Sequence, residues 1–223
     1  MFHCTATHGQ HPVGRPTKSL ISRDKAIRAA LKVIDTEGLD GFSLGAVARR
    51  LKVKSPSLYY YFSDKAELLA EVARQMLLDV RYPDASVGGW EERVIALCVA
   101  TRQSLLTHPN AAPLLLQFFP RHLLLGAYEN AVKGYPFTRD VHLTILEGLE
   151  KLTIGSALFE ASARARNLTS MPEVDAASYP NLAKSVAANP FADEALFVEA
   201  VRMFLAGIKT RTARSRKKAS PAS

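Results

Sequence analysis

The sequence of 223 residues has few cysteines and no long uninterrupted apolar run. Its two cysteines, Cys4 and Cys98, lie in unlike surroundings, so we expect reduced thiols rather than a disulfide framework. The most apolar stretch, residues 111–128, is broken by prolines and polar residues. It therefore falls short of the ~18 apolar residues that a membrane-spanning helix needs. The N-terminus also lacks the layout of a signal peptide, and we expect a cytoplasmic protein with no membrane partner.

Signatures of common enzyme classes are scarce as well. The chain has no HExxH motif, no Cys–His signature and no glycine-rich phosphate loop. An enzyme would have to use scattered residues such as His108, His122, His142 or Glu147. The last two are five positions apart and share no helix face, so we expect no catalytic residues and keep a small helical enzyme as the least favoured alternative.

The two ends of the chain are polar and basic. Residues 1–19 hold His3, Cys4, His8 and His11, which are types that bind metals. Nothing in their spacing fixes a ligand geometry, so we expect a flexible basic arm and neither a metal site nor a cofactor. Residues 213–223 are expected to form a disordered basic tail.

Charge is distributed unevenly along the chain, whose formal net charge is +8. Residues 1–65 carry 11 Lys and Arg against 5 Asp and Glu, and residues 66–206 carry 12 against 16. Residues 207–223 carry 6 basic residues and no acidic ones. A basic head and an acidic body indicate that the head meets a polyanion while the body does something else.

Apolar residues recur at helical spacing along most of the chain, and no segment alternates as a strand would, so we expect an all-α fold. Ser22, Ser43 and Ser63 are predicted N-caps, and Gly38 is predicted to end the first helix in the left-handed conformation. The head is expected to contain helices at 23–37, about 43–51, 56–62 and 64–80. The body is expected to contain helical segments at 90–106, 112–119, 121–134, 138–166 and 191–212.

The second and third predicted helices are short, closely spaced and surrounded by positive charge, which is typical of a helix-turn-helix. The third is too short to be stable alone, so Leu58 and Phe62 should hold it against the first two helices. The side chains pointing outward divide by chemistry. We expect base edges to be contacted by Ser55, Ser57 and Tyr59, and phosphates to be contacted by Lys54, Tyr61 and Lys65.

These residues resemble a known family. The runs GFSLGAVARRL at 41–51, SPSLYYYF at 55–62 and DKAELL at 64–69 are similar to those of the TetR (tetracycline repressor) family. The resemblance implies a homodimeric repressor that binds a palindromic double-stranded DNA operator and is released by a small-molecule effector. It implies a helix-turn-helix DNA-binding domain at 20–80, with its motif at about 43–62. A C-terminal helical ligand-binding and dimerisation domain would then occupy 81–212.

The resemblance also assigns roles to single residues. It places Ser43, Ser55, Pro56, Ser57 and Tyr59 in the major groove and Tyr61 and Lys65 on phosphates. Gly45 stands where the tetracycline repressor has a base-reading arginine, so the operator should differ. Arg15 and Lys18 resemble minor-groove arms of some members, although an ordinary solvated arm fits them equally well.

The C-terminal half matches the family more weakly. Leu115 stands at the position of the tetracycline repressor's metal-binding histidine, so we expect an apolar or aromatic effector rather than a magnesium–tetracycline complex. Candidates for the effector pocket are Phe118, Phe119, His122, His142 and Leu146, although such residues often serve only as core.

Two apolar stripes in the body suit dimerisation through a four-helix interface. The candidate interface residues are Leu149, Leu152, Gly155, Phe159, Val201, Phe204, Leu205 and Ile208. The remaining alternative, suggested by the basic ends, is an architectural protein that binds DNA without sequence preference.

Overall fold

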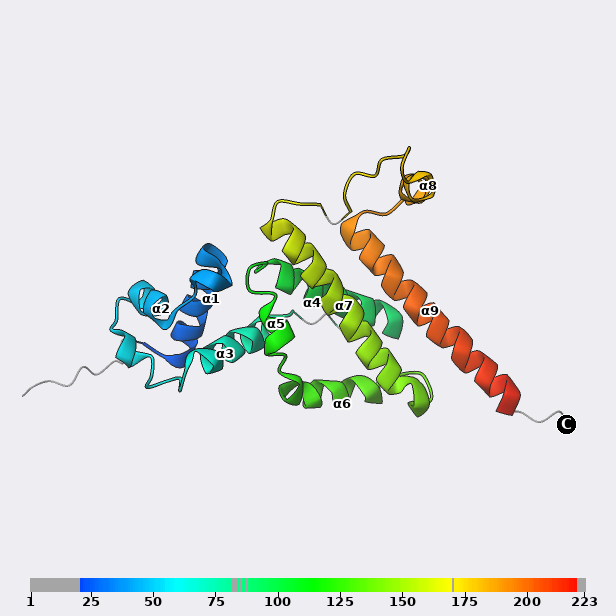
Figure 1. Ribbon diagram of the computed structural model, residues 1–223. Helices are drawn as coiled ribbons and strands as arrows, with labels where there is room; N and C mark the ends of the chain where they lie inside the picture. The colour runs from blue at the N-terminus through cyan, green and yellow to red at the C-terminus, as the bar shows by residue number, and fades with distance from the viewer. Residues whose placement is uncertain (1–20, 82–83, 85, 87, 170, 220–223) are drawn as a thin grey trace, which may run out of the picture.

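The computed structural model describes residues 21–81, 84, 86, 88–169 and 171–219, and every regular element among them is a helix (Figure 1). The all-α prediction is therefore confirmed. The α-helices are α1 (Arg23–Gly41), α2 (Leu44–Leu51), α3 (Lys65–Leu78), α4 (Trp90–Leu106), α5 (Leu114–Gln117), α6 (Leu125–Lys133), α7 (His142–Ala165), α8 (Pro180–Ala188) and α9 (Asp193–Ala219). Short 3-10 helices occur at η1 (Ser55–Ser57), η2 (Arg121–Leu124) and η3 (Arg139–Val141).

Helices α1, α2 and α3 form a small head at one end of the molecule (Figure 1). Ser22 and Ser43 cap α1 and α2 as predicted, because their hydroxyls accept hydrogen bonds from the backbone N–H groups of Lys25 and Ala46. The α3 cap is Asp64, so the assignment to Ser63 was wrong by one position. Gly38 has a φ of 71° and kinks α1, which resumes for one further turn.

The segment predicted as a helix at 56–62 is not an α-helix. It is the 3-10 helix η1 followed by tight turns, in which the N–H groups of Tyr61 and Phe62 both donate to the Leu58 carbonyl at 2.9 and 3.0 Å. So few residues do not offset the cost of nucleating an α-helix. The segment is held by its apolar side chains instead, since Leu58 and Phe62 are fully buried in the head.

One hydrophobic core runs from the head into the body. It contains Ile34 of α1 and Met76 of α3 from the head, together with Leu105, Leu114 and Ala161 from the body. A second core lies among α4, α7 and α9. The short helix α5 packs on α3, so the head is docked on the body through a shared apolar interface.

A polar contact reinforces the same junction. The Asp35 carboxylate on α1 lies 3.0 Å from Nδ1 of His108, which follows α4. The side-chain amide of Asn110 donates to the Asp35 carbonyl at 2.9 Å. The loop after α4 is therefore tied to the head by both the side chain and the backbone of one residue.

Two segments differ from expectation. Residues 180–188, which lie outside the helical segments predicted for the body, form α8, which stands away from the other helices (Figure 1). The last helix continues to Ala219 and so enters the segment from 213 that was expected to be disordered. The physical reason is the run of strong helix formers, Ala, Arg and Lys, with no glycine or proline between Thr212 and Ala219.

The body also contains a buried ion pair between its two central helices. Arg102 of α4 pairs with Glu160 of α7, and its Nε donates to Ser156 at 3.0 Å. Both side chains are at least nine-tenths buried. Arg164 also pairs with Glu160 from the solvent side. Because both charges are removed from water, the desolvation cost of each is offset mainly by its attraction to the other.

Replacing Arg102 by Met should lower the free energy of unfolding by about 3 kcal/mol, the lower end for a broken buried pair because Arg164 remains beside Glu160. Urea denaturation measures this change. The double variant R102M/E160L should recover most of the loss, since no charge is left buried without its partner. Lys133→Met, in the exposed pair with Glu129, is the control and should cost under about 1 kcal/mol. A double variant as unstable as R102M would contradict this account.

Candidate nucleic-acid interface and cavity

The residues predicted to read DNA bases lie together on one side of the head. Ser55, Ser57 and Tyr59 come from η1 and the turn after it, and Tyr59 is 58% exposed. Lys54 and Pro56 in the same segment are exposed. We call residues 54–62 the reading segment, because its exposed polar side chains are available to a groove.

Ser43 is exposed at the start of α2, but its hydroxyl is already used as the cap of that helix. The sequence from Gly41 to Gly45 also spells a GxSxG pattern, which in some hydrolases presents a nucleophile on a strand-to-helix turn. Here the serine follows a helix, and its Oγ accepts the Ala46 N–H at 3.1 Å. The pattern is therefore structural in this chain.

Two of the predicted phosphate contacts have partners inside the head. The Tyr61 hydroxyl donates to the Ile21 carbonyl at 2.8 Å. The Lys65 ammonium donates to the Phe42 carbonyl at 2.9 Å and lies over the Phe42 ring. The structure thus gives both side chains a role in holding the head together. Lys54 and Lys65 are exposed and Tyr61 is half-buried, so the phosphate contacts stay predictions. Arg15 and Lys18 lie outside the described residues.

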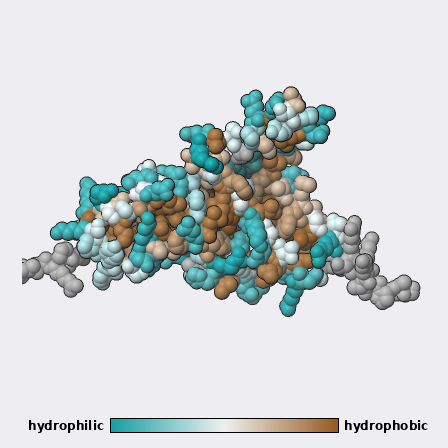
Figure 2. All heavy atoms as spheres, viewed as in Figure 1, coloured by the Kyte–Doolittle hydropathy of each residue, from teal (hydrophilic) through white to brown (hydrophobic). Residues whose placement is uncertain are grey.

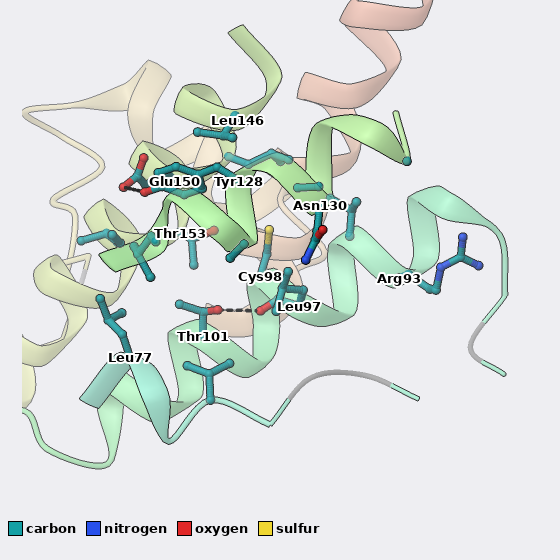
Figure 3. A pocket seen from close by; sticks show the side chains of 18 of the residues that line it. Leu77, Arg93, Leu97, Cys98, Thr101, Tyr128, Asn130, Leu146, Glu150 and Thr153 are labelled. Carbon is teal, nitrogen blue, oxygen red and sulfur yellow. Dashed lines mark hydrogen bonds between the residues drawn. The ribbon is translucent and has the colours of Figure 1, made fainter. Parts of the chain in front are cut away.

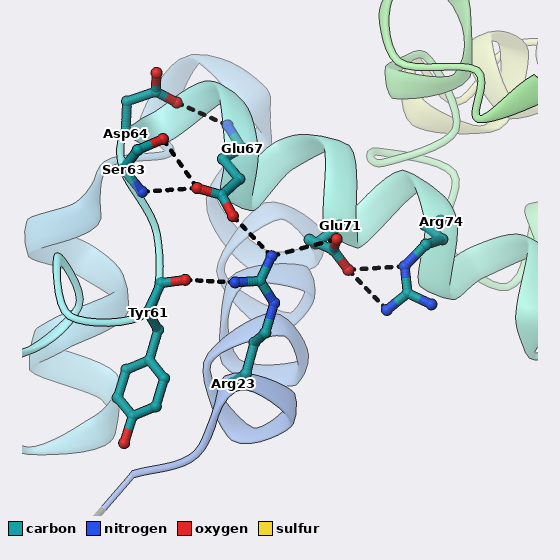
Figure 4. Close-up of polar contacts among 7 residues, drawn as sticks. All are labelled: Arg23, Tyr61, Ser63, Asp64, Glu67, Glu71 and Arg74. Carbon is teal, nitrogen blue, oxygen red and sulfur yellow. Dashed lines mark hydrogen bonds and ion pairs between the residues drawn. The ribbon is translucent and has the colours of Figure 1, made fainter. Parts of the chain in front are cut away.

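Arg23 was not singled out from the sequence, yet it holds the reading segment in place (Figure 4). Its guanidinium donates to the Tyr61 carbonyl and lies 4.7 Å from the centre of the Phe62 ring. The same group pairs with Glu67 at 2.8 Å and with Glu71 at 3.3 Å, both on α3. One side chain from the start of α1 therefore connects the turn after η1 to α3, and only the tertiary structure brings these three segments together.

Glu67 is the most strongly hydrogen-bonded carboxylate of this cluster (Figure 4). It accepts the Ser63 backbone N–H at 2.7 Å and the Ser63 hydroxyl at 2.9 Å. These bonds, with that from Arg23, favour the charged form and lower the pKa of Glu67 to about 2. The carboxylate is therefore ionised at neutral pH and fixes the chain just before α3.

A cavity of about 730 Å³ lies in the body, among α3, α4, α6 and α7 (Figure 3). Its walls are mostly aliphatic and aromatic, with Trp90, Phe119, Tyr128 and Tyr135 supplying the rings. The remaining lining residues are Leu77, Val80, Arg93, Val94, Leu97, Cys98, Thr101, Leu124, Ala127, Asn130, Ala131, Gly134, Leu146, Leu149, Glu150, Thr153 and Ile154. Its size and character suit a small, largely apolar molecule.

Burial keeps the weak acids of this cavity neutral. It raises the pKa of the Cys98 thiol, and it raises the pKa of Tyr135 to about 12. It also raises the pKa of Tyr128, together with the neighbouring Glu150 carboxylate, to which the Tyr128 hydroxyl donates at 3.0 Å. These groups offer hydrogen bonds rather than charge at neutral pH.

Only part of the predicted pocket set lines this cavity. Phe119 and Leu146 do. Phe118 packs instead against the core shared by head and body, and His122 is exposed on η2. His142 is the first residue of α7. Its ring meets the Tyr135 ring edge-on at 5.2 Å between centres, and its Nε2 lies 2.9 Å from the Phe137 carbonyl oxygen. The three were misplaced because their surroundings are set by turns that the sequence does not position.

The predicted dimer residues also divide into two groups. Leu149, Val201, Leu205 and Ile208 are buried in the second core of the protomer itself, so they are not free to face a partner. Leu152, Gly155, Phe159 and Phe204 lie at the surface or are half-buried. The apolar stripes of α7 and α9 are thus wide enough to pack on each other first, and the sequence alone did not show which edge is left over.

Within the described residues, no helix combines the length and apolar character needed to cross a membrane. Among the same residues, no three His, Cys, Asp or Glu side chains come together as a metal would require. The cluster of His3, Cys4, His8 and His11 lies outside them.

Comparison with known proteins identifies the family. The model described as "Bacterial regulatory proteins, tetR family" matches residues 26–72, and the one described as "Tetracyclin repressor-like, C-terminal domain" matches residues 82–212. The chain belongs to the TetR family. TetR-family proteins are transcriptional regulators rather than enzymes, and the head described above is their DNA-binding unit.

Individual relatives agree with this assignment. The HTH-type transcriptional repressor DrrR1 of Streptomyces coeruleorubidus is 28% identical over 195 residues, which are 82% of this chain and 70% of that protein. An HTH-type transcriptional regulator of Saccharopolyspora erythraea is 35% identical over 98 residues. Those residues are 44% of this chain, and they span only 42% of that relative's length.

Solved structures show the same fold. A possible TetR family transcriptional regulator from Streptomyces coelicolor A3(2) matches with a TM-score of 0.68 and 26% identity, covering 85% of this chain and 99% of that one. ActR from Streptomyces coelicolor matches with a TM-score of 0.71 and 21% identity, covering 89% of this chain and 100% of that one.

The low pKa of Glu67 predicts how the head of this TetR-family protein responds to acid. A group whose pKa is lowered on folding contributes stability that is present above its ordinary pKa of 4.5 and is lost as the pH falls towards 2. Glu67→Gln should therefore flatten the fall in unfolding free energy over this range, as measured by urea denaturation at a series of pH values. Arg74→Gln removes a partner of Glu71 on the same helix and serves as the control. An unchanged acid profile in E67Q would contradict the assignment.

Proposed function

We propose that this TetR-family regulator is a homodimeric repressor that binds a palindromic operator and is released when a small molecule fills the cavity in its body. The observation that carries the proposal is the physical connection between the two sites. The reading segment lies on the head, the cavity lies in the body, and α3 belongs to both. Because a repressor acts on the chromosome, we place it in the cytoplasm.

Helix α3 supplies a route for the coupling. Near its end, Leu77 lines the cavity, and at its beginning Glu67 and Glu71 hold Arg23, which holds the reading segment. A ligand that displaces the end of α3 also moves the carboxylates at its start, because a helix transmits displacement as a rigid element. Coupling of about 1–3 kcal/mol would weaken operator binding by about 5- to 150-fold, which is enough for induction.

The dimer face proposed here differs from the one expected from the sequence. It consists of the exposed edge of α7 and α9, where Phe159 is 82% exposed and Met203 is 68% exposed. At Gly155 an added side chain would meet nothing within the protomer, so a partner helix has room to approach. Apolar surface gathers over the region of α7 and α9 in Figure 2. A partner packed here gives two heads related by a two-fold axis, which suits a palindromic operator.

The reading segment predicts a separation of roles between neighbouring residues. Tyr59→Ala or Ser57→Ala should relax operator specificity, with a loss of about 1–3 kcal/mol on the operator, because both side chains face outward from η1 and its turn. Lys54→Gln should weaken binding uniformly and reduce the salt slope by about 1. The measurements are footprinting on DNA upstream of the protein's own and neighbouring genes, followed by titration at several salt concentrations.

Lys184→Gln on α8 is the charge-matched control for Lys54 and should leave both quantities unchanged. Equal affinity for operator and unrelated DNA, with no protected palindrome at physiological salt, would replace the repressor with a nonspecific architectural binder.

The dimer face makes a separate prediction. Phe159→Glu or Met203→Glu places a charge in the proposed apolar interface and should shift the protein from dimer to monomer in sedimentation velocity. Leu116→Glu is the control, because Leu116 is 74% exposed on α5, which is not one of the two helices of this face. A protein that remains dimeric in both F159E and M203E would place the interface elsewhere.

A further inference from the structure

Among the described residues that line the cavity, Glu150 is the one acidic side chain, and its surroundings define the chemistry of the ligand. Glu150 of α7 lies at the wall of the cavity with its side chain 13% exposed. One carboxylate oxygen accepts the Tyr128 hydroxyl at 3.0 Å. The other, Oε2, is buried and accepts no hydrogen bond. A buried carboxylate oxygen in this condition favours a donor placed against it, because the charge has lost its contact with water.

Arg121 balances this carboxylate only in part. Its guanidinium lies 3.4 Å from Glu150 Oε2, but it donates a hydrogen bond at 2.8 Å to Glu147, one turn earlier on α7. One guanidinium that is 49% exposed is therefore shared between two carboxylates. Lys151 pairs with Glu147 and is 70% exposed, so it adds little on the cavity side.

Arg93, the basic residue among the described lining residues, does not offset the charge of Glu150. Arg93 donates to the Gly88 carbonyl at 2.8 Å, and its side chain points away from the cavity in Figure 3. Tyr128 and Cys98 stay neutral, since burial raises the pKa of each. Glu150 therefore supplies the charged group in the described lining whose buried oxygen is held only by an ion pair that Arg121 shares with Glu147.

A second buried polar atom lies along the same helix. Thr153 is 3% exposed and lines the cavity, and its hydroxyl makes no regular hydrogen bond, with the Cys98 thiol as its polar neighbour. Around these groups the walls are aromatic and aliphatic, with the rings of Trp90 and Phe119 among them. The polar atoms are thus confined to one part of an otherwise apolar cavity.

We infer that the cavity selects a flat, polycyclic aromatic cation, whose protonated nitrogen pairs with Glu150 and whose rings lie between the aromatic walls. This inference rests on the proposed function, since it assigns the chemical class of the effector. Aromatic walls favour such a cation through ring contacts, and the carboxylate excludes an anion of the same shape by like-charge repulsion.

The test uses three probes of one shape without DNA: 9-aminoacridine as the cation, acridine as the neutral compound and acridine-9-carboxylate as the anion. Trp90, the sole tryptophan of the chain, lines the cavity, so quenching of its emission reports occupancy, and calorimetry gives the affinities. The cation should bind about tenfold or more tightly than the anion at neutral pH. Equal affinities, or a preference for the carboxylate, would overturn the inference.

Three variants locate the source of the preference. Glu150→Gln should bring the cation and the anion to similar affinities, whereas Glu147→Gln, which changes the same charge outside the lining, should keep a clear preference for the cation. Arg121→Gln removes the guanidinium that competes for Glu150 and should therefore increase the preference for the cation over the anion. Equal effects of E150Q and E147Q would show a general field rather than a contact and would overturn the assignment to Glu150.

The inference and the proposed function fail in different ways. Selective binding of 9-aminoacridine with no protected operator would support the ligand class and contradict the proposed repressor function. A protected palindrome with no charge preference among the acridines would support the repressor function and contradict the proposed ligand class.

Discussion

The shared apolar core between the head and the body is the constraint on which the rest of the structure depends. The head is built from short helices and a 3-10 turn, which form little stable structure by themselves. They are stable because their buried side chains pack together, and Ile34 and Met76 extend this cluster to Leu105 and Leu114 of the body. A change in the body therefore reaches the head through packed side chains rather than through a flexible linker.

Polar contacts add direction to this apolar junction. Arg23 fixes the reading segment to the start of α3, and Asp35 fixes α1 to the loop after α4. Neither contact is strong by itself, because both pairs are partly exposed. Their value lies in orientation, since each defines one relative position of two elements that hydrophobic burial alone would allow to slide.

The cavity shows the opposite balance of forces. Its apolar walls complete the packing of α4 and α7, while Glu150 and Thr153 leave polar atoms incompletely paired inside the protein. Such groups cost stability, and their presence in an apolar cavity is typical of a site that is completed by a ligand. The carboxylate in the cavity wall contrasts with the basic head, in agreement with the division of charge along the chain.

The sequence by itself determined the fold class, the helix-turn-helix head, most helix positions and the family resemblance. These follow from local patterns: apolar spacing, capping serines and the left-handed glycine at Gly38 all act within a few residues. The exposed reading residues Ser57 and Tyr59 could be named in the same way, because they alternate with the buried Leu58.

Only the tertiary structure decided which side chains meet across the chain. It assigned Tyr61 and Lys65 to contacts within the head, moved His122 and His142 out of the cavity lining, and buried four of the predicted dimer residues in the protomer's own core. It also revealed Arg23 and Glu150, whose partners are distant or lie on another helix. The physical reason is that an apolar stripe or a charge shows what a residue needs as a partner, whereas the path of the chain in three dimensions decides which partner it finds.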